Sequence, residues 1–194
     1  MNSEEAFGER LAKRLRPLVP QKYHIETKRS LLYAISFDDK GRLELGQDSA
    51  QQPTRGGGTG FEQDLLLFER VTGDESVRTA IIPRVSVELK FGGVSTHDSI
   101  VYSEKARRIR AIYPFVRYGL ILGGLQHIPG RTLRLGTEFD FVLALPIPVR
   151  EATLMRVAKL LRTELRLSRK LTDILSGRDK VASLHRSLRH SHIA

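Results

Sequence analysis

The sequence predicts an α/β domain in which a central mixed β-sheet is flanked by helices. Strand-like apolar runs at 61–71 and 80–91 lie between segments of helical periodicity at 4–15 and 98–112, and such a mixture of elements is typical of α/β folds. A chain of 194 residues is long enough for one domain with a sizeable core and short for two. We therefore expect a single domain over residues 1–177, followed by a basic, flexible C-terminal tail over residues 178–194.

Three segments have the apolar spacing of amphipathic helices. Ser3 is a suitable N-cap for the first, and His97 or Asp98 is the expected N-cap of the second. Gly177 follows the third and terminates it. The third helix is long and rich in leucine, so we expect it to form the interface of a homodimer. The predicted helices cover residues 4–15, 98–112 and 150–174.

Apolar and β-branched runs bounded by turn residues predict the strands. The polar loop 72–78 separates the two longest runs, and these should pair as a hairpin. Residues 46–60 are rich in glycine and predict a mobile loop, although successive glycine N–H groups can also wrap a phosphate. The predicted strands cover residues 23–27, 31–37, 42–45, 61–71, 80–91, 116–122, 132–135 and 138–145.

Composition narrows the class of function. The formal net charge of +10 suits a polyanionic partner such as DNA, although a basic surface can also serve solubility alone. The chain has no cysteine, which excludes disulfides and thiolate chemistry. No apolar run reaches the length of a membrane span, and the N-terminus lacks the pattern of a signal sequence. We expect a cytoplasmic protein that does not bind membranes.

The residues of greatest chemical interest lie on the predicted hairpin. If its loop is centred near Ser76, Asp64 lies opposite Glu88 and Glu62 lies opposite Lys90, with all four side chains on one face. Directly opposed side chains have Cβ atoms roughly 4.5–5.5 Å apart, a span that one divalent ion can bridge. The other face carries leucines and valines and should form the core.

Two alternatives to this reading remain open. A tighter turn at residues 73–74 would place Asp64 opposite Pro83, outside the cluster. In the second alternative the register holds, but Asp64, Glu88 and Lys90 merely neutralise one another in a surface ladder of salt bridges.

This order of residues resembles the PD-(D/E)xK restriction-endonuclease-like superfamily. An acid on one strand, Glu-x-Lys at the end of the next strand, and then a helix and a strand carry the resemblance, which covers residues 61–124. It implies a restriction-endonuclease-like core in which Asp64 and Glu88 bind Mg²⁺ and Lys90 positions or helps to deprotonate a water. Glu62 is a possible additional ligand. Gln63 stands where the superfamily motif has a proline.

The chemistry of these residue types agrees with that implication. Phosphodiester hydrolysis needs a nucleophile at neutral pH and stabilisation of the charge that develops on the phosphate, and carboxylate-bound Mg²⁺ together with a lysine supplies both. We therefore expect a Mg²⁺-dependent endodeoxyribonuclease that cuts double-stranded DNA, of the type II restriction class. A junction-resolvase-like repair nuclease and a non-catalytic DNA-binding module are the alternatives.

Basic side chains on the helix after the motif are the candidate DNA contacts. Beside an active site they would bind phosphates, whereas elsewhere such residues usually form a solvated helix face. The candidates are Lys105, Arg107, Arg108 and Arg110.

Overall fold

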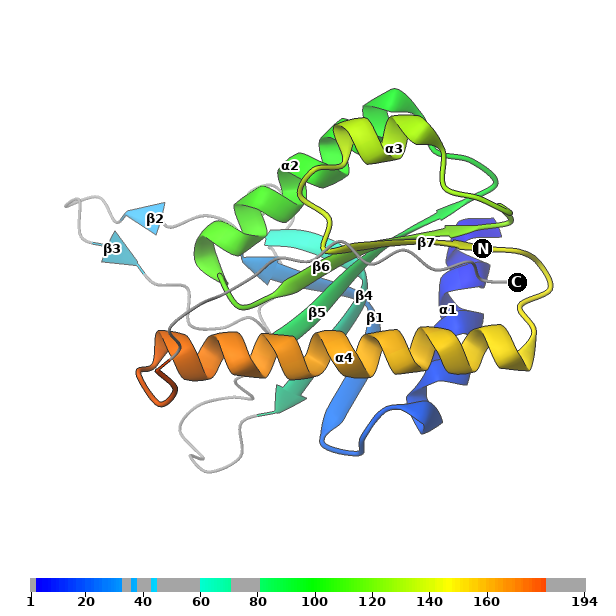
Figure 1. Ribbon diagram of the computed structural model, residues 1–194. Helices are drawn as coiled ribbons and strands as arrows, with labels where there is room; N and C mark the ends of the chain where they lie inside the picture. Colours follow the sequence, from blue (N-terminus) through cyan, green and yellow to red (C-terminus); the bar gives the residue numbers. More distant parts are fainter. Residues whose placement is uncertain (1–2, 33–35, 38–42, 45–59, 71–80, 181–194) are drawn as a thin grey trace.

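A five-stranded mixed sheet lies between two layers of helices in the computed structural model, which describes residues 3–32, 36–37, 43–44, 60–70 and 81–180 (Figure 1). This architecture confirms the predicted α/β class. The strands of the sheet stand in the order β1-β4-β5-β6-β7, and β2 pairs only with β3. Their bounds are β1 Tyr23–Leu32, β2 Ser36–Phe37, β3 Leu43–Glu44, β4 Gly60–Arg70, β5 Ile81–Phe91, β6 Arg117–Gly123 and β7 Phe141–Leu145.

The direction of pairing changes in the middle of the sheet. Strands β1, β4 and β5 pair antiparallel, whereas β5, β6 and β7 pair parallel. The connection from β5 to β6 is a helical crossover, as parallel neighbours require. The helices are α1 Ser3–Leu15, α2 Thr96–Ile112, α3 Gly130–Leu135 and α4 Glu151–Leu175, with a 3-10 turn η1 at Arg16–Leu18.

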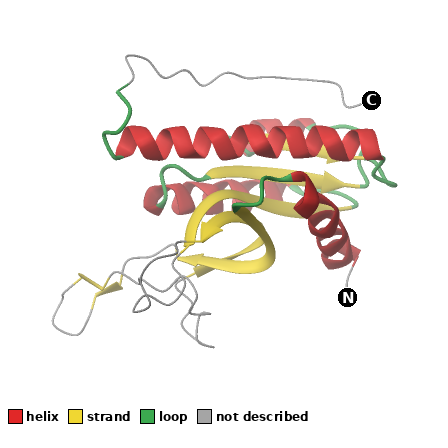
Figure 2. Cartoon of the chain, turned by 90° about the horizontal axis from the view of Figure 1, so that it is seen from below, coloured by secondary structure: helices red, strands yellow, loops and turns green. Residues whose placement is uncertain are grey.

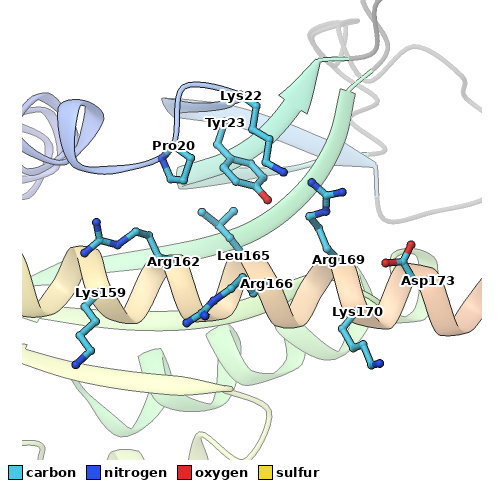
Figure 3. A pocket seen from close by; sticks show the side chains of 10 residues that line it. All are labelled: Pro20, Lys22, Tyr23, Lys159, Arg162, Leu165, Arg166, Arg169, Lys170 and Asp173. Carbon is cyan, nitrogen blue, oxygen red and sulfur yellow. The ribbon is translucent and has the colours of Figure 1, made fainter. Parts of the chain in front are cut away.

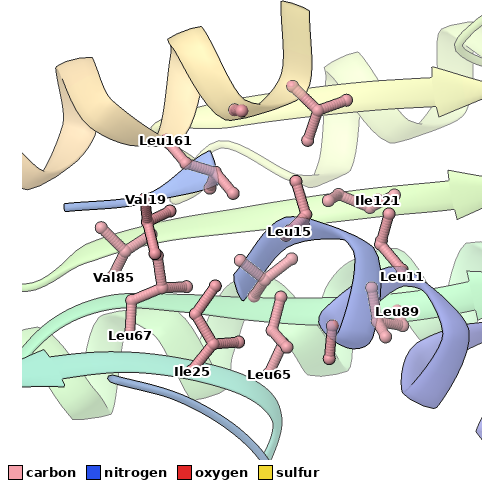
Figure 4. Packing of buried hydrophobic residues seen from close by; sticks show 14 of the residues in the cluster. Leu11, Leu15, Val19, Ile25, Leu65, Leu67, Val85, Leu89, Ile121 and Leu161 are labelled. Atoms are coloured by element: carbon pink, nitrogen blue, oxygen red, sulfur yellow. The ribbon is translucent and has the colours of Figure 1, made fainter. Parts of the chain in front are cut away.

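Both faces of the sheet are covered and apolar. Leu65 and Val85 pack with α1 and α4 on one face (Figure 4), and the long helix α4 runs beside the strands in a second view (Figure 2). Leu66 and Tyr118 pack with α2 on the other face. From the sequence we expected a core on one face of the hairpin and acids with a lysine on the other, but the second face also contributes apolar residues to a core. A sheet covered by helices on both sides buries successive residues of its central strands.

Two predicted strands differ from the structure. Residues 23–32 form one continuous strand where two were predicted, and residues 132–135 belong to helix α3. The run Thr132 to Leu135 is too short for its period to separate helix from strand. Its first residue is buried, and the N–H of Gly136 donates to the Thr132 carbonyl at 2.8 Å, which closes the helical turn.

Helix α2 begins with a capping box. The hydroxyl of Ser95 accepts a hydrogen bond from the N–H of Asp98 at 3.0 Å, and the N–H of Ser95 donates to the Asp98 carboxylate at 2.8 Å. Ser95 is therefore the N-cap in place of His97 or Asp98, and Asp98 completes the reciprocal pair.

Three leucines of α4 lie in the chain's own core, whereas Leu167 and Leu175 are exposed. Leu154, Leu161 and Leu165 are buried against the sheet, so they do not supply an apolar face for a partner. The homodimer stays a prediction. Among the described helices, none is both long and apolar enough to cross a bilayer.

Some sequence predictions fall on residues that the structure does not describe. These are most of the glycine-rich stretch 46–60, the loop 72–78 and the tail from residue 181 onward. The first residues of the predicted tail are described and contact the end of α4: Arg178 pairs with Asp173 at 2.8 Å, and Asp179 pairs with Lys170.

Candidate functional site

The register of the β4–β5 hairpin is the one that the sequence predicted around a loop centred near Ser76. Leu65 lies opposite Val87 and Leu67 lies opposite Val85. The alternative with a tighter turn is therefore wrong for this part of the hairpin. A register shift after Leu67 brings Phe68, not Asp64, opposite the proline of β5. The ladder ends at Leu65 and Val87, so the candidate acids lie where the two strands separate.

At Lys28 the side chains of β1 exchange the two faces of the sheet, so that odd-numbered residues before and after it point to opposite faces. Ile25 packs in the core beneath α1, whereas Leu31, also an odd-numbered residue, packs in the core beneath α2. Between them Lys28 has φ 57°, in the left-handed region that residues other than glycine rarely adopt. One residue in this conformation is enough to exchange the two faces of the strand.

Strand β4 changes sides at the matching position. Thr27 pairs with Leu65 and Arg29 pairs with Gln63. Lys28 and Asp64 therefore lie at the point where both strands exchange faces. Gln63 is buried and accepts a hydrogen bond from the Ser86 hydroxyl, on the side of α2. Asp64 therefore lies on the side of α1. The expectation that Asp64 and Glu62 share a face with Glu88 and Lys90 is wrong, because it assumed unbroken alternation.

Asp64 lines a small cavity next to α1. Helix α1 approaches β5 closely here, since a Cβ on Gly8 would lie 2.8 Å from the Cδ1 of Leu89. The N–H of Leu89 donates to Asp64 Oδ2 at 2.9 Å, so this carboxylate is held against the backbone between the two motif residues of β5. The cavity has a volume of about 220 Å³. It is also lined by Glu4, Glu5, Glu9, Thr27 and Lys28.

Lys28 is the counter-charge of the acids on β4. Its Nζ lies 3.2 Å from Asp64 Oδ1 and 3.2 Å from Glu62 Oε1. Burial acts to lower the pKa of Lys28, but the two carboxylates outweigh it and the pKa is raised. Glu62 therefore pairs with Lys28 and lies opposite Ser30 of β1, not opposite Lys90 as predicted.

Glu88 is buried on the other side of the hairpin. Its Oε1 accepts hydrogen bonds from Lys105 Nζ at 2.7 Å and from the Tyr118 hydroxyl at 2.6 Å. Burial raises the pKa of Glu88, the nearby charge of Asp64 raises it further, and Lys105 acts against both. The two acids are thus close enough for their charges to interact, although each has its own lysine.

Lys90 lies at the end of β5, between two helices. Its Nζ is 3.6 Å from Glu4 Oε2 on α1 and 3.8 Å from Asp98 Oδ1 on α2. Both distances are longer than a hydrogen bond. Lys90 does not neutralise Asp64 or Glu88, so the three-residue ladder considered as an alternative does not form.

The four basic residues of α2 divide into two pairs. Arg107 and Arg108 are exposed and both bind Glu104 on their own helix. Lys105 and Arg110 point inward: Lys105 binds Glu88, and Arg110 binds Glu138 at 2.8 Å. The outward pair keeps the geometry of a candidate phosphate contact, while Lys105 is a partner of the site itself.

Lys28 and the inward orientation of Lys105 were missed by sequence reasoning. Lys105 is four residues before the buried Ile109, so its helical spacing signalled the inner face. Lys28 gave no such signal, because the residues that favour a left-handed conformation are glycine, asparagine and aspartate.

The acids at the site offer the kind of donor atom that a hard divalent cation prefers. Asp64 and Glu88 offer carboxylate oxygens, and Mg²⁺ is commonly held by one or two carboxylates that are completed by water and substrate phosphate. Each carboxylate already has a lysine partner, Lys28 for Asp64 and Lys105 for Glu88, so a cation bound there would compete with these ammonium groups. Among the residues that the structure describes, no three acidic or histidine side chains are placed to hold one metal ion.

Comparisons with known proteins do not assign the chain to a family. No model of a protein family matches the sequence, and a search of curated proteins finds no match.

Proposed function

We propose that this chain is a Mg²⁺-dependent endodeoxyribonuclease that hydrolyses phosphodiester bonds in double-stranded DNA, of the type II restriction class. The observation that carries the proposal is the placement of Asp64 and Glu88 where β4 and β5 separate, with Lys90 two residues further along β5. The element order from α1 through β1, β4, β5 and α2 to β6 agrees with the PD-(D/E)xK resemblance. The net charge of +10 favours a polyanionic substrate.

Each residue has a distinct role in this chemistry. Mg²⁺ held by Asp64 and Glu88 would polarise the phosphate and lower the pKa of a bound water. Asp64 is held by the Leu89 N–H and Glu88 by Tyr118, so neither carboxylate needs to reorganise to bind a cation. Lys90 has only long ion pairs and is about a quarter exposed, which leaves its ammonium group able to orient a water and to offset charge on the phosphate.

The lysines beside the two acids prepare the site for DNA. Unpaired carboxylates would repel the phosphodiester backbone, whereas Lys28 and Lys105 offset part of that negative charge before a substrate arrives. Lys28 is about half exposed and can swing away, while Lys105 is largely buried. We expect the ion pair between Lys28 and Asp64 to break when a cation binds Asp64.

A non-catalytic DNA-binding module is the second candidate. The same ion pairs favour it, since both acids are already neutralised by side chains of the chain itself. In that case Asp64 and Glu88 stabilise the hairpin and take no part in chemistry.

The test is cleavage of a long, unmodified duplex of mixed sequence by the purified chain, with Mg²⁺ or with EDTA. We expect cleavage in Mg²⁺ alone, and its loss in the variants Asp64→Asn and Lys90→Ala. The matched controls are Glu151→Gln and Lys13→Ala. Glu151 forms an exposed ion pair with Arg14, and Lys13 is exposed on α1, so both should cut like the wild type.

The result separates the candidates. A wild-type chain that binds the duplex but leaves it intact in Mg²⁺, or an Asp64→Asn variant that cuts normally, rejects the nuclease and favours the binding module. Preferential cutting of a four-way junction over the duplex would reassign the activity to a repair nuclease.

A further inference from the structure

A second positively charged feature lies outside the candidate site, between α4 and the chain that leads into β1 (Figure 3). It is a groove of about 730 Å³. The buried side chains of Tyr23 and Leu165 contribute to its lining. Six basic side chains also line it: Lys22, Lys159, Arg162, Arg166, Arg169 and Lys170.

Helical periodicity explains why the charges gather there. Leu161 and Leu165 of α4 are buried against the sheet. The basic residues from Lys159 to Lys170 recur at spacings of three and four, which aligns them in a row along the helix beside that buried face.

Several positive charges of the groove are not neutralised by described acidic residues. Its one acidic lining residue, Asp173, is bound by Arg178 at 2.8 Å, and Lys170 is bound by Asp179. Within the described residues, Lys159, Arg166 and Arg169 form no salt bridge. The three are exposed, and three like charges on one helix face repel one another, so an anionic ligand would relieve that repulsion.

We propose that this groove binds the sugar–phosphate backbone of DNA as a second contact surface. The α4 cations from Lys159 to Lys170 span about 16 Å at 1.5 Å per residue. Phosphates of one strand recur every 3.4 Å along a duplex axis, so a row of this length is long enough to reach more than one of them. The only aromatic side chain in the lining, that of Tyr23, is buried, and the exposed lining is rich in cations, as suits contacts to the phosphate backbone.

The groove is separate from the candidate active site. Tyr23 begins β1 and Lys28 lies five residues further on, which corresponds to about 17 Å along the strand. The inference deepens the proposed function, on which its choice of DNA rests, because it adds an anchoring surface for the same substrate away from the reacting phosphate. Contacts of this kind are independent of base sequence and depend strongly on salt.

The test measures binding of a short mixed-sequence duplex in EDTA, over a series of salt concentrations. The groove variant is Arg166→Glu with Arg169→Glu. The matched control is Arg131→Glu with Arg134→Glu, at exposed positions of α3. Each pair of substitutions lowers the formal net charge by four, from +10 to +6. Exposed positions on helices tolerate such changes, and circular dichroism checks the fold of both variants.

We expect the groove variant to lose about tenfold or more in affinity, and its plot of log K against log salt to become shallower by about 1.8, since each lost phosphate contact removes about 0.9. The control should retain the wild-type slope. Equal effects in both variants would overturn the proposal and leave only a general effect of net charge. Loss of binding to phosphatidylserine vesicles with unchanged DNA binding would overturn it in favour of a membrane surface. Because EDTA prevents metal-dependent cleavage, failure here is distinguishable from failure of the nuclease proposal.

Discussion

Replacing Lys105 with Met removes the charge that neutralises Glu88 and keeps an unbranched side chain of similar length. The two groups are 2.7 Å apart, with side chains that are 13% and 3% exposed. Removing one partner of a buried ion pair leaves an uncompensated charge and costs about 3–5 kcal/mol. We expect a loss near 3 kcal/mol at about pH 8, at the lower end of that range, because the Tyr118 hydroxyl still donates to the same carboxylate.

The dependence on pH identifies the charge as the cause. Burial raises the pKa of Glu88 above its unfolded value of 4.5, so the folded chain binds this proton more tightly than the unfolded chain does. The contribution of protonated Glu88 to the free energy of unfolding is therefore fully present below the pKa of the unfolded state. It is lost as the pH rises through the pKa of the folded state. Without Lys105 the folded pKa rises further. The substitution should cost little near pH 5 and its full amount near pH 8.

The assay is urea unfolding followed by circular dichroism, in EDTA, at both pH values. A loss of 3 kcal/mol lowers the midpoint by roughly 1–2 M urea. Adding Glu88→Gln to the Lys105→Met variant should restore most of the stability near pH 8, since no charge is then left unpaired. An equal loss at both pH values, with no recovery in the double variant, would refute the reasoning and assign the effect to packing of the lysine stem.

Substitutions at three further positions test the local geometry by the same unfolding measurement. Lys28→Ala and Lys28→Gly lose the same ion pairs, but of the two residues only glycine suits a φ of 57°. We therefore expect the Gly variant to be more stable than the Ala variant by about 1 kcal/mol. An Ala variant more stable than the Gly variant, as is usual in a strand, would contradict the left-handed conformation. In Gly119→Ala the new Cβ would meet the Phe141 ring, with an expected loss of about 1–3 kcal/mol that Phe141→Leu partly reverses. Ser95→Ala removes the N-cap of α2 and should cost about 1 kcal/mol, whereas unchanged stability would mean that the capping box contributes nothing.

The hairpin register was predictable because two long apolar runs meet across one polar loop. Leu65, Leu67, Val85 and Val87 all had to reach the same core, and a slip of one residue would turn the apolar side chains of one strand away from it. The helices were equally clear, since α2 and α4 are long and periodic. The short helix α3 was not, because a six-residue element is held by tertiary contacts more than by its own pattern.

The arrangement of the candidate site could be predicted only in part. Alternation placed Glu88 and Lys90 on the face opposite the leucines and valines, and Glu88 does bind Lys105 of α2, while Lys90 lies between Glu4 of α1 and Asp98 of α2. It failed for Asp64, because the change of side in β4 follows from the left-handed Lys28 on the neighbouring strand. A conformation that one residue adopts under constraint from another strand leaves no mark in the local pattern.

The central claim is that Asp64, Glu88 and Lys90 form a metal-dependent hydrolytic site. Its most direct test is the single-turnover rate of cleavage of bound duplex in Mg²⁺, for the wild type and for Glu88→Gln. Gln keeps the shape of Glu88 and can still accept the Tyr118 hydrogen bond. We predict equal DNA affinity and a rate lower by about a hundredfold or more in the variant. Equal cleavage rates at equal affinity would contradict the claim.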